Sequence, residues 1–134
     1  MAMSQESPAG ESYPDPAPML EEACAARAGD EAAALAFALA RIGTVEGRPP
    51  MLVCPRRWLT EHGRPFPAAV APGDACLLLV ATRNDMDALW AMEQALRSGA
   101  VAGVVGAVGN ASLTQTRRLD FAAREGGCLS LIHI

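Results

Sequence analysis

Apolar and polar positions form alternating blocks along this chain, and the blocks predict strands and helices in turn. Apolar runs predict strands at Met51 to Cys54, Ala75 to Ala81, Ala100 to Val108 and Cys128 to Ile134, of which only the last contains polar residues, Ser130 and His133. Such runs are typical of strands in a parallel sheet that is covered on both faces. Residues 55 to 75 carry several prolines and arginines and are predicted to form a long connection.

Three blocks with helical periodicity separate these strands. They span Asp30 to Ile42, Asp85 to Ser98, and a block that opens with the capping box Ser112 and Gln115 and runs to Glu125. Asp30 is placed to cap the first helix, and glycines follow all three blocks. The boundaries are therefore marked by local chemistry as well as by periodicity.

The apolar positions predict how two of these helices pack. The first helix is apolar nearly all round, Phe37 included, so we expect it to pack deep against a sheet. The second carries one apolar stripe, from which Glu93, Gln94 and Arg97 are expected to face away. Asp85 and Asp87 stand at its start, where helix capping is a sufficient explanation for two acids.

Strands alternating with helices predict an α/β fold with a mostly parallel sheet flanked by helices. The length of 134 residues supports one domain, which we place at residues 19–134. Residues 1–18 are rich in Pro, Ser, Glu and Gly and are predicted to be a disordered N-terminal segment.

Composition narrows the function classes. The net charge of −4 argues against bulk attraction to nucleic acid, although a local basic patch remains open. The four cysteines and two histidines form no cluster with metal-ligand spacing, so no metal is expected. No apolar run approaches the ~20 residues of a membrane span. Free cysteines in apolar surroundings favour a reduced, cytoplasmic protein with no membrane partner.

Three segments together resemble the ImuA family and the RecA core to which that family is related. They are ARAGDEAAALAFALA (26–40), TEHGRPF (60–66) and ALWAMEQALRSGAVAGVVGAVGNASLTQTRRLDFAAREGGCLSLI (88–132). In the RecA pattern the first corresponds to the phosphate-binding loop and its helix. The third contains the strand that bears the Walker B acid. The resemblance implies a truncated RecA-like core.

The departures from RecA bear directly on activity. A working phosphate loop needs a Lys to neutralise phosphate and a hydroxyl to hold Mg²⁺. At that position this chain reads Gly29, Asp30, Glu31, and the two carboxylates stabilise a helix N-terminus but repel a triphosphate. Gly106 stands where the Walker B acid is expected. We therefore expect no ATP hydrolysis, no bound cofactor and no catalytic residue.

The resemblance implies a non-catalytic accessory protein of SOS-induced mutagenesis and translesion DNA synthesis. Its implied partners are an ImuB-like protein, which is polymerase-like but lacks catalysis, and the error-prone polymerase complex, with RecA as a further candidate. Two alternatives stay open: a divergent RecA-like P-loop ATPase, and a cell-division inhibitor of the SulA type.

Two groups of residues are candidates for contact with a partner or with DNA. The first is a basic-aromatic stretch of Arg56, Arg57, Trp58 and Arg64, with Phe66. It could stack on single-stranded DNA or grip an acidic partner. The alternative, which we favour, is that its aromatic residues cover the sheet edge while the arginines are solvated.

The second group lies on the later helices. Trp90 lies beside the apolar stripe of its helix, one turn after Met86, and fits the core edge better than an interface anchor. Arg117 and Arg118 fit an ordinary solvated face better than a binding surface.

The last seven residues, CLSLIHI, have the pattern of a strand but also resemble translated sequencing adapter. We expect the chain to be a fragment with a partly foreign tail, and we assign no role to His133.

Overall fold

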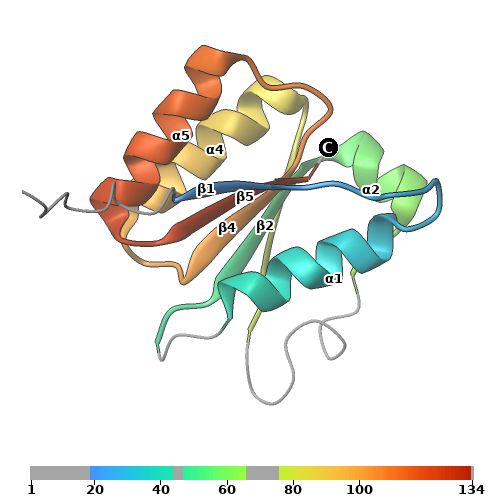
Figure 1. Cartoon of the computed structure of the whole chain (residues 1–134), viewed down its shortest axis with the longest axis horizontal. Helices are drawn as coiled ribbons and strands as arrows, with labels where there is room; N and C mark the ends of the chain where they lie inside the picture. The colour runs from blue at the N-terminus through green and yellow to red at the C-terminus, as the bar shows by residue number, and fades with distance from the viewer. Residues whose placement is uncertain (1–18, 44–46, 66–75, 134) are drawn as a thin grey trace, which may run out of the picture.

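The computed structural model describes residues 19–43, 47–65 and 76–133 (Figure 1). Its elements in chain order are β1 (Leu20–Ala23), α1 (Glu31–Ile42), β2 (Pro50–Pro55), α2 (Arg56–His62), β3 (Leu78–Thr82), α4 (Asp85–Ser98), β4 (Gly103–Ala107), α5 (Leu113–Gly126) and β5 (Leu129–His133). The disorder expected for residues 1–18 and the position of Phe66 lie outside the described residues.

The five strands form one parallel sheet in the order β1-β5-β4-β2-β3. The predicted parallel α/β fold is therefore confirmed. Helices α4 and α5 lie side by side on one face of the sheet, and α1 covers the other (Figure 1). None of the described helices has both the length and the apolar character to cross a membrane.

The register of the central strands sorts side chains between the two faces. Leu52, Val105 and Leu131 stand side by side in β2, β4 and β5, and all three pack in the cluster beneath α1. One position further along, Val53, Gly106 and Ile132 stand side by side and face α4 and α5. Because successive residues of a strand point to opposite faces, each central strand supplies both layers.

Local signals predicted the helix boundaries well. α4 runs over Asp85–Ser98 as expected, and its end is closed by Gly99 in the left-handed conformation. The capping box of Ser112 and Gln115 at the start of α5 is present, with both reciprocal bonds formed. Asp30 occupies the N-cap position of α1, but its side chain makes no capping bond.

The structure differs from the sequence prediction at three elements. Residues 56–62 form helix α2 instead of part of an irregular connection. Strand β1 was not predicted. Strand β3 lies at the edge of the sheet, so its side chains are only partly buried, although Leu79 and Val80 still pack against the clusters on the two faces. An edge strand can be as apolar as a central one, and the sequence pattern does not distinguish the two.

Three side chains also differ from expectation. Phe37 is 63% exposed, because α1 buries only the side that carries Leu35, Ala38 and Leu39. Trp90, expected at the core edge, is 61% exposed. Glu93, expected to face away from the core, is only 5% exposed.

Candidate functional site

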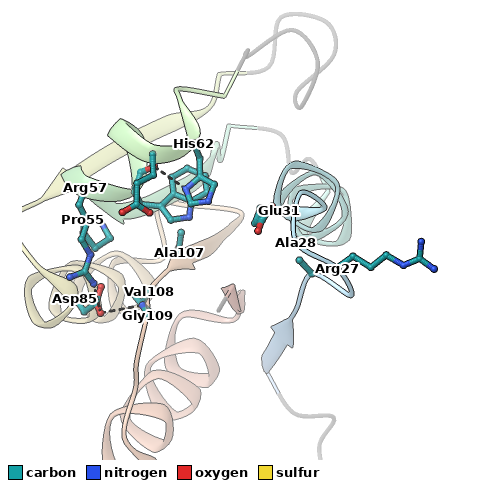
Figure 2. A pocket seen from close by; sticks show the side chains of 13 residues that line it. Arg27, Ala28, Glu31, Pro55, Arg57, His62, Asp85, Ala107, Val108 and Gly109 are labelled. Atoms are coloured by element: carbon teal, nitrogen blue, oxygen red, sulfur yellow. Dashed lines mark hydrogen bonds and ion pairs between the residues drawn. The ribbon is translucent and has the colours of Figure 1, made fainter.

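A crevice near the carboxyl ends of the strands lies where the strand order reverses. From β2 the chain moves outward to β3, whereas from β4 it moves the opposite way to β5. In open α/β sheets this switch point is the usual position of a ligand site. A cavity of about 360 Å³ lies there, bordered by Pro55 at the end of β2 and Ala107 at the end of β4 (Figure 2).

Of the residues at the phosphate-loop position, Glu31 lies on one wall of this cavity. Gly29 adopts a φ of 97°, and its backbone N–H donates to the Glu31 carboxylate over 2.9 Å. A phosphate loop binds its ligand through free backbone N–H groups of this kind. Here a carboxylate of the protein occupies that donor, and Glu31 lines the cavity while Asp30 does not.

Asp85 forms a comparable contact on the opposite wall. Its Oδ2 accepts from the backbone N–H of Gly109, just beyond β4, over 3.1 Å. The same oxygen pairs with Arg57 Nη2 at 2.9 Å (Figure 2). Helix capping is therefore not the role of Asp85, since the cap of α4 is the Asn84 side chain, which accepts from the Asp87 N–H. Asp85 connects α2, α4 and the end of β4.

Sequence reasoning missed this role of Asp85, although one signal was present. The residue follows the end of β3 by three positions, and the carboxyl ends of parallel strands meet at one edge of the sheet. An acid at that point can reach the ends of neighbouring strands as readily as it can cap its own helix.

Gly106, at the Walker B position, does not line the cavity. It stands in the middle of β4, between Val53 and Ile132 in the neighbouring strands. A Cβ atom added at Gly106 would overlap the Met92 sulfur and lie 2.7 Å from its methyl carbon. The space that an acidic side chain would need is therefore filled by α4.

The charges on the cavity wall favour cations over anions. Glu31, Glu61 and Asp85 contribute carboxylates, against Arg27 and Arg57. The Arg27 side chain points away from the other lining residues in Figure 2, and Arg57 is paired with Asp85. A triphosphate at this wall would meet carboxylates with little compensation from arginines.

The basic-aromatic stretch does not form a continuous surface. Trp58 is half-buried against the cluster beneath α1, and its ring stacks on His62 at 4.8 Å between centroids. Arg57 is engaged with Asp85, while Arg56 and Arg64 are exposed. The favoured interpretation of this stretch, an aromatic residue that packs on the sheet with solvated arginines around it, is thus supported for Trp58.

The structure brings together two candidate residues that are distant in sequence. Trp90 of α4 and Arg118 of α5 line the same shallow groove of about 130 Å³. Arg118 Nη2 pairs with Glu93 Oε2 at 2.9 Å, which fixes it beside the groove. Arg117 is exposed and makes no ion pair within the described part of the chain.

Comparisons with known proteins place the fold. No protein-family model and no curated protein matches the chain. Among solved structures, SulA from Pseudomonas aeruginosa is similar with a TM-score of 0.59 and 20% sequence identity. The match covers 88% of this chain and 98% of that one. The chain therefore has a SulA-like α/β fold.

Proposed function

We propose that this chain is a non-enzymatic protein-binding module of the bacterial response to DNA damage. It acts by contacting an ImuB-like polymerase-related partner and, through it, the error-prone polymerase complex. The sequence resemblance to ImuA supplies the partner, and the SulA-like fold is compatible with the same cellular setting. The carboxylates at the switch point disfavour a bound nucleotide, which supports binding to a protein over ATP-driven catalysis as the function.

The observation that carries the proposal is the occupation of the anion-binding N–H groups. Glu31 accepts from Gly29, and Asp85 accepts from Gly109, on opposite walls of the cavity. A nucleotide would have to displace both carboxylates and then remain beside them. Like charges at contact distance in a partly enclosed site cost several kcal/mol, in the range that separates micromolar from millimolar binding.

Two measurements test the proposal. The purified chain is expected to co-elute with the ImuB-like protein in size-exclusion chromatography. It is also expected to leave the fluorescence of a labelled ATP analogue with Mg²⁺ unchanged and to release no phosphate. RecA serves as the positive control for the nucleotide assays. Turnover of ATP would support the divergent P-loop ATPase instead, and the absence of any complex with the ImuB-like protein would refute the proposed partner.

A second candidate function is inhibition of cell division in the manner of SulA. It is favoured by the fold match, because the aligned region spans nearly the whole SulA chain. This function predicts binding to the bacterial tubulin homologue of the division ring and a loss of its GTP-dependent assembly. A sedimentation assay of polymer, with and without the chain, separates this candidate from the adaptor.

A further inference from the structure

Large apolar side chains are exposed on the outer side of the α4–α5 layer. Met86 and Trp90 of α4 are 70% and 61% exposed, and Phe121 of α5 is 58% exposed. Phe121 follows Arg118 by three residues and precedes Glu125 by four, and both of these pair with residues of α4. Residues three and four apart share a helix face, so Phe121 lies on the α4 side of α5.

Arginines lie on the same two helices as these apolar side chains, and one acid that pairs with two of them is buried. Glu93 pairs with Arg97 at 3.0 Å and Arg118 at 2.9 Å. The Glu93 side chain is 7% exposed, whereas those of Arg97 and Arg118 are 45% and 62% exposed. Solvent therefore meets the Arg118 guanidinium and not the Glu93 carboxylate, whereas Arg97 also pairs at 3.5 Å with Glu125, whose side chain is 49% exposed. Arg117, four residues before Phe121, adds an exposed cation without an ion pair in the described residues.

Aromatic residues, Met and Arg are the side chains that protein interfaces prefer over other surfaces. Exposed large apolar side chains with polar groups beside them are typical of a binding surface. The groove beside Trp90, at about 130 Å³, has room for a small apolar group and is too small for a nucleotide. The α4–α5 layer thus has the exposed apolar side chains and the arginines that are typical of a protein-binding surface.

We propose that this surface, the Trp90 face, binds an acidic amphipathic helix of a partner protein. The Trp90 face consists of Met86, Trp90, Arg97, Arg117, Arg118 and Phe121. Aliphatic side chains of the partner helix pack on Trp90 and enter the groove, and its flanking carboxylates meet Arg117 and Arg118. This inference rests on the proposed function, for which it names the binding surface and the chemistry of the partner.

Charge complementarity selects an acidic helix over single-stranded DNA, the other polymer that binds aromatic residues and arginines. Arg97 and Arg118 are already paired with carboxylates, which leaves Arg117 as the unpaired cation of the face. Binding to nucleic acid draws on several cations that neutralise phosphates together. One unpaired arginine on a chain of net charge −4 can orient an acidic helix but cannot neutralise a phosphate backbone.

Trp90 fluorescence tests the proposal directly in the full chain carrying Trp58→Phe, which leaves Trp90 as the reporter. The probes are a 16-residue amphipathic peptide with leucines on one face and flanking glutamates, the same peptide with lysines for glutamates, and a 12-nucleotide oligothymidylate. We expect the glutamate peptide to bind at least about tenfold more tightly than the lysine peptide. The oligonucleotide is expected to produce no saturable change.

Variants are compared by calorimetry with the glutamate peptide. Trp90→Ala is expected to weaken binding about tenfold or more, as truncation of an aromatic anchor does at an interface centre. Phe37→Ala is the matched control, because Phe37 is equally exposed but lies on α1, across the sheet. Arg117→Glu is expected to weaken binding of the glutamate peptide and to strengthen binding of the lysine peptide, because the charge that distinguishes the two peptides is reversed.

Several results would overturn the proposal: no binding of the glutamate peptide, equal binding of both peptides, Trp90-dependent binding of the oligonucleotide, or an equal effect of Phe37→Ala. A change of oligomeric state with Trp90→Ala in sedimentation would assign the face to a second copy of this chain instead. Failure of the proposed function is recognised separately, as loss of the complex with the ImuB-like protein. If that complex forms and is unaffected by Trp90→Ala, the adaptor function is supported, and the proposal that the Trp90 face is its binding surface is refuted.

Discussion

Replacing Gly106 tests why a glycine stands at the Walker B position. Its neighbours across the sheet are Val53 and Ile132. The fully buried side chain of Met92 in α4 packs against the glycine. A Cβ atom there would overlap the Met92 sulfur. The Gly106→Ala variant must therefore push the end of Met92 aside within a packed core.

The expected cost can be worked out from these contacts. Overpacking by one methyl group in a tight core costs about 1–3 kcal/mol. Replacing Gly by Ala returns about 0.4–1 kcal/mol, since the unfolded chain loses freedom. The thioether is flexible enough to absorb part of the clash. We expect Gly106→Ala to lower the free energy of unfolding by about 1–2 kcal/mol, and Gly106→Asp to prevent stable folding because it buries an unpaired carboxylate.

Urea denaturation followed by circular dichroism measures the effect, and a double-mutant cycle assigns its cause. Met92→Ala alone is expected to cost about 2–5 kcal/mol. Combined with Gly106→Ala it should cost less than the sum, by about 1 kcal/mol or more, because the new methyl group occupies part of the vacated space. A Gly106→Ala variant within about 0.5 kcal/mol of the parent, or an additive cycle, would refute the packing explanation for this glycine.

Three further predictions concern stability. The Ser130 hydroxyl is buried without a hydrogen-bond partner, so Ser130→Ala should raise the free energy of unfolding by about 1 kcal/mol, and an unchanged urea midpoint would contradict this. Ser112→Ala removes the capping box of α5 and should lower the free energy of unfolding by about 1 kcal/mol in urea denaturation. Thr114→Ala on the same exposed turn should have a smaller effect. Burial raises the pKa of Cys54 to about 11. The folded state therefore holds that proton more tightly than the unfolded state, and stability present below pH ~9 should be lost as the pH rises toward 11. A Cys54→Ala variant whose urea midpoint falls as steeply as that of the parent between pH 8 and 10.5 would exclude this thiol as the cause.

Local chemistry was sufficient for part of this fold. The capping box at Ser112 and the glycines after α4 and α5 predicted helix boundaries that the structure reproduces. Alternation of apolar strands with helices predicted the parallel sheet, since helices that connect successive parallel strands cover both faces of the sheet. These signals lie within a few residues of the structure that they specify, so one sequence is enough to detect them.

The assignment of side chains to surfaces required the tertiary structure. Glu93 belongs by polarity to the solvent side of α4, yet it is buried because two arginines, one of them on α5, enclose its carboxylate. Trp90 belongs by polarity to the core, yet it is exposed because α5 packs beside it and not over it. Helical periodicity predicts the angular position of each side chain around its own helix axis. It does not predict which of these side chains a neighbouring helix buries.

The sequence by itself thus determined the class of fold, most helix ends, and the acidic character of the phosphate-loop position at Gly29, Asp30 and Glu31. Only the tertiary structure decided that Asp85 reaches Gly109 and Arg57, and that Met92 fills the space beside Gly106. The physical reason is the range of the interactions. Caps and periodic patterns act within one or two turns, whereas these contacts join residues from separate strands and helices that meet only when the sheet has formed.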